Sequence, residues 1–83
     1  MYTVYILKSE IRGRYYVGYS NDVEARLRKH NSGGNKSTRP YRPWKTVYTE
    51  QFSDKRSAWL REQQIKRYKG GEAFKKLVSG GFA

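Results

Sequence analysis

Apolar side chains gather in three short stretches of this sequence with the spacing and residue types of β-strands. Residues 2–7 (YTVYIL) are rich in β-branched and aromatic side chains and are apolar on both faces, which predicts a central strand. Residues 15–20 repeat with a period of two, and residues 46–52 form the third stretch. The polar segment 8–14, which contains Gly13, predicts a hairpin loop between the first two strands.

Between and after these strands, apolar side chains recur every three or four residues, as they do in amphipathic helices. The first helix is predicted over residues 22–30, with Val23 and Leu27 facing the core. Asn21 is expected to open this helix, with Glu24 completing a capping box. The glycines that follow the sequence Asn-Ser are expected to stop it.

The C-terminal third of the chain predicts two more helices. One begins at Ser53-Asp54 and ends at Gly70-Gly71. A short one is expected over residues 74–78, where Phe, Leu and Val have helical spacing, and residues 80–83 are expected to fray.

The element order is strand, strand, helix, strand, helix, helix. This order predicts an α+β fold with a small three-stranded antiparallel sheet flanked by helices. We interpret residues 1–83 as one domain, because the chain is too short for two. A chain of this length buries only about 60% of its unfolded surface, so the core is expected to be thin.

Charge narrows the class of partner. The chain has 18 basic and 7 acidic residues and a net charge of +11, which favours a polyanionic partner. Nucleic acid is the leading candidate, and an anionic membrane surface is the second. The sequence has no cysteine, which excludes disulfides, thiol nucleophiles and the common structural zinc sites. With no stretch near the ~20 apolar residues that span a bilayer, and no secretory signal, the sequence favours a cytoplasmic location.

Glu62 is the carboxylate with the most information. It lies on the core-facing stripe of the second predicted helix, where a charged group costs free energy unless it is paired or binds a cation. One interpretation is a Glu that reaches solvent, or an ion pair with Arg26 or Arg61. The other is a Mg²⁺ ligand, because magnesium needs only one or two protein carboxylates when phosphate and water complete its shell.

Two tyrosines and two basic groups are candidates for one surface. If the hairpin is symmetric, Tyr5 lies opposite Tyr16 and both point to the same face. Arg26 and His30 are four apart on the first helix, so they project side by side. A tyrosine hydroxyl, with its pKa near 10, acts as a general base only if positive charge lowers that pKa, and Arg26 is expected to do so. The alternatives are core tyrosines, a solvated arginine and a histidine that interacts with the helix dipole.

Basic and aromatic side chains alternate in the proline-containing segment 35–45. This segment is either a solvated loop or a surface that tracks a strand and stacks bases. Exposed cations of the second helix suit phosphate contacts as well. The candidate nucleic-acid contacts are Lys36, Arg39, Tyr41, Arg42, Trp44, Lys45, Lys66 and Arg67.

Together these residues resemble a known family. TVYIL at residues 3–7 and YVG at residues 16–18 resemble the two signature tripeptides of the GIY-YIG nuclease domain. The likeness continues through Arg26, His30 and Glu62 and covers nearly the whole chain. More narrowly, the sequence is similar to small single-domain bacterial members of the UPF0213 type. It departs from the tripeptides at Thr3, where the family has glycine, and by valine for isoleucine in both.

The resemblance implies divalent-metal phosphodiester cleavage and assigns roles. Tyr5 falls on the tyrosine of the first tripeptide, a general-base candidate, and Tyr16 on that of the second, beside the attacking water. Arg26 falls on the arginine that contacts the scissile phosphate, and His30 on a histidine that some members use. Glu62 falls on the metal ligand. The 83 residues leave no room for a DNA-reading domain of the kind on which homing and repair members rely, so the resemblance leaves the substrate open.

The sequence therefore predicts an endonuclease that uses Mg²⁺ or Mn²⁺ to hydrolyse DNA phosphodiester bonds, with branched or nicked DNA as the expected substrate. The alternative is a non-catalytic nucleic-acid-binding module with the same fold. An RNA-directed role is a third interpretation. A homodimer is an open option, because one site cuts both strands only by pairing or rebinding.

Overall fold

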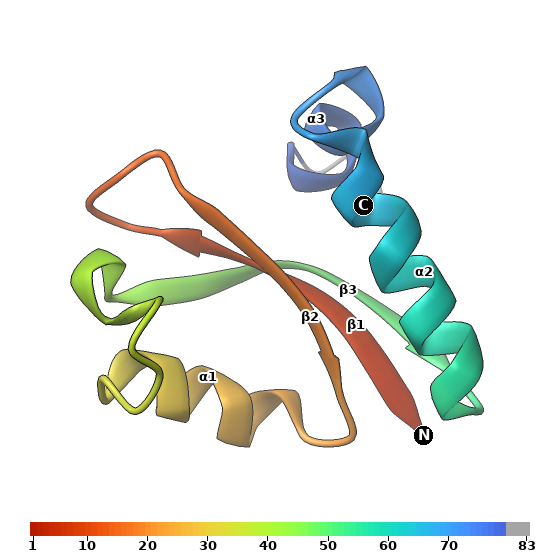
Figure 1. Ribbon diagram of the computed structural model, residues 1–83, viewed down its shortest axis with the longest axis horizontal. Coiled ribbons are helices and arrows are strands. Elements are labelled where there is room, and N and C mark those ends of the chain that lie inside the picture. The colour runs from red at the N-terminus through yellow and green to blue at the C-terminus, as the bar shows by residue number, and fades with distance from the viewer. Residues whose placement is uncertain (80–83) are drawn as a thin grey trace.

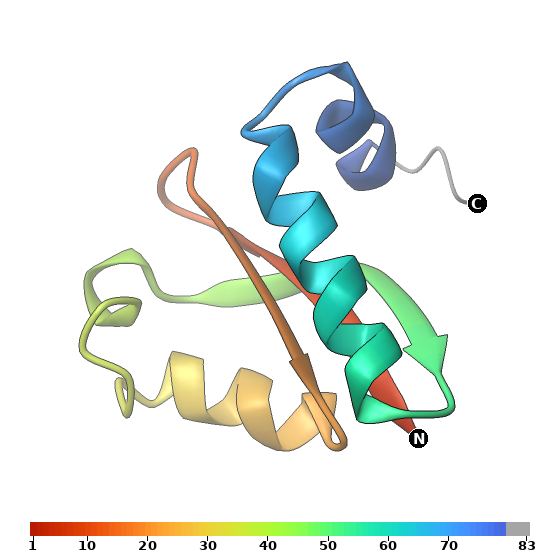
Figure 2. The same ribbon diagram turned by 45° about the vertical axis from the view of Figure 1, so that its right-hand side comes forward.

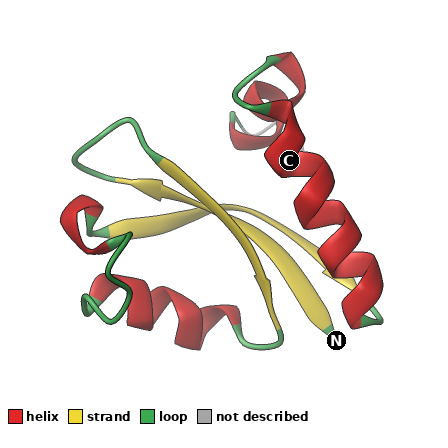
Figure 3. Ribbon diagram, viewed as in Figure 1, coloured by secondary structure: helices red, strands yellow, loops and turns green. Residues whose placement is uncertain are grey.

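The computed structural model describes residues 1–79, and the predicted frayed end at 80–83 lies outside them. The strands are β1 (Tyr2–Ser9), β2 (Tyr15–Ser20) and β3 (Trp44–Phe52), and the helices are α1 (Val23–Asn31), α2 (Lys55–Tyr68) and α3 (Glu72–Val78), with a short 3₁₀ turn at Arg39–Tyr41. The predicted order β-β-α-β-α-α and the α+β class are confirmed (Figures 1 and 3).

The three strands of residues 1–79 form one antiparallel sheet in the order β2-β1-β3. The central place of β1 follows from its sequence, because both of its faces are buried from Val4 to Leu7. β3 begins two residues earlier than predicted, at Trp44. That tryptophan is buried in the core, so the strand extends into the segment that its prolines and cations mark as a loop.

The predicted register between β1 and β2 is wrong by two residues. Tyr5 lies opposite Gly18, and Leu7 lies opposite Tyr16. The ladder continues further than expected because Ser9 is buried and its N–H donates to the Arg14 carbonyl at 2.9 Å. A shift of two keeps each side chain on its face, so both tyrosines still point to the same side of the sheet.

The sheet separates two small cores. On one face, Val4 and Ile6 pack with Ala58 and Ile65 of α2 and with Phe74 of α3. On the other face, Tyr5, Leu7 and Trp44 pack together, and partly buried side chains of α1 cover them. Figures 1 and 2 show the consequence, with α1 on one side of the sheet and α2 with α3 on the other.

Helix α1 is capped by Asp22 instead of Asn21. The Asp22 carboxylate accepts a hydrogen bond from the Ala25 N–H at 3.0 Å, so the predicted capping box with Glu24 is wrong. A carboxylate is the better cap here because it also interacts favourably with the helix dipole. Asn21 is thereby left free of the capping role.

The far end of α1 is attached to β3 by one side chain. The Asn31 amide accepts a hydrogen bond from the Trp44 N–H at 2.5 Å and donates one to the Trp44 carbonyl at 3.1 Å. The indole N–H of Trp44 donates in turn to the Thr38 carbonyl at 3.0 Å. These bonds satisfy backbone groups at the start of an edge strand, where the sheet offers them no partner on that side.

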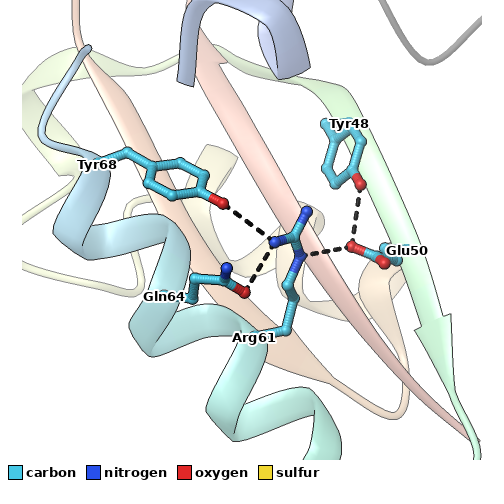
Figure 4. A network of polar contacts seen from close by, with 5 residues as sticks. All are labelled: Tyr48, Glu50, Arg61, Gln64 and Tyr68. Carbon is cyan, nitrogen blue, oxygen red and sulfur yellow. Dashed lines mark hydrogen bonds and ion pairs between the residues drawn. The ribbon is translucent and has the colours of Figure 1, made fainter. Parts of the chain in front are cut away.

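Helix α2 is fixed by a polar network on the side that faces β3 (Figure 4). The Arg61 guanidinium donates to Glu50 at 2.8 Å, and it also donates to Gln64 and to the Tyr68 hydroxyl. The Tyr48 hydroxyl donates to the same Glu50 carboxylate at 2.9 Å. The network fixes the rotation of α2 about its axis with Arg61 toward β3. The next residue, Glu62, must therefore point in another direction.

We predict that Asn31→Ala lowers the free energy of unfolding by about 1–3 kcal/mol, because the substitution leaves a partly buried backbone N–H and carbonyl without their partners. Urea unfolding followed by tryptophan fluorescence measures this. Arg28→Ala, at an exposed position of the same helix, is the control and is expected to change little. Equal unfolding midpoints for the two variants would show that the Asn31 contacts do not stabilise the fold.

Candidate functional site

A polar cavity of about 430 Å³ lies where β1, β2, α1 and α2 meet. Its lining includes four of the five residues proposed from sequence to act in catalysis. The complete lining is Tyr2, Tyr5, Tyr16, Gly18, Tyr19, Ser20, Asn21, Arg26, Lys55 and Glu62. The fold therefore brings together side chains that are up to 60 residues apart (Tyr2 to Glu62).

Gly18 is the residue that lets Tyr5 enter this cavity. A Cβ at position 18 would lie 2.7 Å from the Tyr5 hydroxyl oxygen, 2.9 Å from its Cζ and 3.1 Å from the Tyr16 ring. Real side chains do not approach this closely, so any other residue would displace the phenol. The glycine is needed for space alone, because its φ lies outside the left-handed region.

The two phenols stack beside each other in the cavity, with ring centroids 6.3 Å apart. The pKa of Tyr5 is raised to about 12, chiefly by burial; the electrostatic interactions with Tyr16 and Glu62 also raise it, and Arg26 lowers it. The Arg26 contribution has the expected direction, but burial exceeds it. With a pKa raised in this way, Tyr5 is a neutral phenol at pH 7.

Arg26 reaches the cavity from the exposed edge of α1, next to the partly buried Leu27. Asn21, which was expected to cap the helix, lines the same cavity. The Asp22 cap explains the difference. It begins the helix one residue later, so Asn21 lies in the turn between strand and helix, where it lines the cavity.

His30 lies behind the cavity. Its ring packs on that of Tyr16 with centroids 4.6 Å apart, and its Nδ1 is hydrogen-bonded to the Thr38 hydroxyl at 2.8 Å. The His30 side chain is only 3% exposed. Among the described residues, Tyr16 lines the cavity and His30 does not. The arrangement suits a residue that orients Tyr16 better than one that meets solvent or substrate.

Glu62 is buried at 8% exposure and lines the cavity. Neither expected arginine pairs with it, since Arg61 bonds to Glu50. Instead Gln63 donates to one oxygen at 2.9 Å, and the half-exposed Lys66 ammonium lies 3.5 Å from the other. An exposed lysine at that distance binds weakly, so the carboxylate stays available to a stronger cation.

The donor set fits a hard divalent ion of the magnesium type. Residues 1–79 contain no group of three or more His, Cys, Asp or Glu side chains that could enclose a metal. A single buried carboxylate in a water-accessible polar cavity is what Mg²⁺ or Mn²⁺ requires when phosphate oxygens and water supply its other ligands. Glu62 is the side chain that would hold such an ion.

The predicted basic surface is only partly realised. Trp44 is 4% exposed and packs in the core, so its prediction as a base-stacking residue is wrong, and Tyr41 is half-buried beneath the Arg14 guanidinium. The sequence pattern misled here because a strand-forming tryptophan stands among loop cations. The predicted cations are exposed: Lys36, Arg39, Arg42, Lys45, Lys66 and Arg67. Their contact with nucleic acid stays a prediction.

We predict that stability falls as the pH decreases from 7 toward 5. Burial lowers the pKa of His30 below its ordinary value of 6.5, and the charges of Arg26 and Lys29 act in the same direction. The unfolded chain therefore binds more protons than the folded one below pH 6.5, and the stability due to neutral His30 is lost as the pH falls through its folded pKa. Urea unfolding at several pH values measures this. The variant His30→Gln is measured in parallel, because it retains the pH dependence due to the carboxylates and lacks that due to His30. An imidazole pKa at or above 6.5 by NMR would contradict it.

None of the helices within residues 1–79 is long and apolar enough to cross a membrane. A known protein-family model matches almost all of the residues that the structure describes. The sequence model of the GIY-YIG catalytic domain matches residues 1–75.

The chain is 42% identical over 78 residues to UPF0213 protein SERP0126 of Staphylococcus epidermidis, covering 93% of this chain and 94% of that one. It is 47% identical over 66 residues to UPF0213 protein SA0446 of Staphylococcus aureus, covering 78% and 79%. The solution NMR structure of UPF0213 protein BH0048 from Bacillus halodurans matches with a TM-score of 0.57 and 38% identity, over 94% of this chain and 82% of that chain. The chain therefore belongs to the GIY-YIG nuclease family, with the UPF0213 proteins as its relatives.

Proposed function

We propose that this protein is an endonuclease that uses Mg²⁺ or Mn²⁺ to hydrolyse DNA phosphodiester bonds. The observation that carries the proposal is the shared cavity, which joins two phenols, a guanidinium and a buried carboxylate. Cations for binding the substrate and groups for transferring a proton are then within one space. Membership of the GIY-YIG family supports the same reaction class.

The positive groups of the cavity serve the scissile phosphate. Arg26 of α1 and Lys55 of α2 both line the cavity, so a phosphate between them meets cations on two sides. An arginine fork also matches the oxygens of the phosphate as negative charge develops on them. The net charge of +11 draws the DNA backbone to this surface before any specific contact forms.

Glu62 is the metal ligand of the proposal. A divalent ion at its carboxylate would neutralise this charge and stabilise the negative charge that develops on the phosphate and on the leaving oxygen. The Lys66 ammonium, which lies 3.5 Å from the carboxylate and is half exposed, has room to turn toward solvent or toward a neighbouring phosphate.

Tyr5 is the general base of the proposal, and Tyr16 orients the attacking water beside it. Burial is the main cause of the raised pKa of Tyr5 and the charge of Glu62 adds to it, so compensation of that charge by a cation would lower the pKa of Tyr5. Arg26 acts in the same direction. His30 serves as a positioning residue, since its ring supports that of Tyr16.

A panel of duplex, nicked, branched and single-stranded DNA, with a parallel RNA panel, tests this function. We predict cleavage in Mg²⁺ or Mn²⁺ that Glu62→Gln reduces by about 100-fold or more while DNA binding is retained. Glu72→Gln, at an exposed position of α3, is the control and is expected to cleave normally. Binding without cleavage across the panel and both metals would contradict the proposal and identify a non-catalytic nucleic-acid-binding module.

The close approach of Gly18 to Tyr5 gives a second test. We predict that Gly18→Ala lowers the rate of cleavage by about 10- to 100-fold, because a displaced phenol no longer meets the attacking water. Gly13→Ala is the matched control, since a Cβ there meets nothing within 4 Å. Circular dichroism and thermal unfolding establish that both variants fold. Equal rates for the two alanine variants would show that the Tyr5 hydroxyl has no role in the reaction.

A further inference from the structure

A second cavity, of about 410 Å³, lies between β2, the C-terminal half of α2 and the start of α3. Its exposed lining is mostly carbon, unlike that of the polar cavity. The lining residues are Tyr15, Tyr16, Val17, Ile65, Lys66, Lys69, Gly70 and Phe74. Its volume falls within the range of about 300–1,000 Å³ that is usual for small-molecule sites. We call it the apolar cavity.

The apolar cavity adjoins the proposed catalytic site. Tyr16 lines both cavities. Lys66 lines the apolar cavity, and its ammonium lies 3.5 Å from the carboxylate of Glu62, which lines the polar one. The two cavities are therefore neighbours, with Tyr16 common to both.

The walls of the apolar cavity are aromatic, whereas its rim carries positive charge. Tyr15 and Phe74 meet edge to face, with ring centroids 5.1 Å apart, and they give the cavity an aromatic wall. Tyr15 is 38% exposed, so part of its ring is open to a ligand. Lys66 and Lys69 are exposed cations at the rim, and the Lys8 ammonium lies 5.9 Å from the centre of the Tyr15 ring.

An apolar, aromatic cavity beneath several cations complements a nucleotide, whose planar base and anionic phosphate need these two surroundings side by side. An apolar peptide would satisfy the walls but leave the cations of the rim without partners. On a protein of net charge +11, this charge complementarity favours the nucleotide.

We propose that the apolar cavity binds the unpaired nucleobase of a nucleotide that neighbours the scissile phosphate. The proposal rests on the proposed function and names its substrate class, which is DNA with at least one unpaired nucleotide beside the cut, as in single strands, flaps and branch points. In a paired duplex every base is stacked inside the helix, so filling the cavity requires the cost of turning a base out.

Binding can be tested apart from cleavage. Oligonucleotides that carry the fluorescent base 2-aminopurine at one position, moved along the strand, are titrated with protein in EDTA. We expect strong quenching at one or two positions of an unpaired segment, because the base stacks on an aromatic ring. Tyr15→Ala is expected to weaken binding by about 5- to 100-fold, and Tyr15→Phe to retain it. Uniform quenching at all positions, with Tyr15→Ala equal to wild type, overturns the proposal.

The rim is tested with a pair of charge variants. Lys69→Ala is expected to weaken binding of the oligonucleotide more than Lys76→Ala, which removes the same charge from an exposed position of α3. Equal losses would show that only total charge matters and would overturn the assignment of the rim.

Cleavage then separates this proposal from the nuclease function. With active protein, an abasic nucleotide is moved through the positions flanking the cut. Slower cleavage at one position only supports the base site, and cleavage that ignores every abasic position overturns it while the nuclease function stands. Position-specific quenching in a protein that never cleaves supports the base site and contradicts the nuclease function.

Discussion

The seating of helix α2 on the sheet is the constraint on which the candidate site depends. Ala58 and Ile65 bury one stripe of this helix against Val4 and Ile6 of the central strand. Because helical residues advance by about 100° each, that contact also fixes where the rest of the helix points. The network around Arg61 holds one flank, and Glu62 must then face the polar cavity on the other. In a domain with so thin a core, few other contacts could correct a rotation of this helix.

A buried carboxylate at this position has a cost that the rest of the cavity reduces. Gln63 donates a hydrogen bond to Glu62, the Lys66 ammonium lies 3.5 Å from its other oxygen, and Arg26 of α1 lines the same cavity. Burial is the main cause that raises the pKa of the neighbouring Tyr5 to about 12, so this phenol is neutral at pH 7.

The sequence was sufficient for the order and type of the elements, because the strands and helices have clean periodicity and clear stop signals. It was also sufficient to place Glu62 on the buried stripe of α2. It failed wherever distant contacts decided the outcome. Ser9 extends the hairpin and shifts the register, and burial of Trp44 turns an expected stacking residue into a core residue. The apolar cavity needs Tyr15 beside Phe74, a contact across 59 residues that no local pattern reveals.

The most direct test of the account is the location of a divalent ion in the free protein. Mn²⁺ added in small steps to the ¹⁵N-labelled chain broadens the amide signals of residues nearest the bound ion. The account predicts that Gly18, Arg26 and Glu62 lose their signals first, and that Glu62→Gln abolishes this selectivity. First broadening around exposed acids such as Glu24 or Glu72, with Gly18 and Glu62 unaffected, would contradict the claim that the polar cavity is a metal-dependent catalytic site.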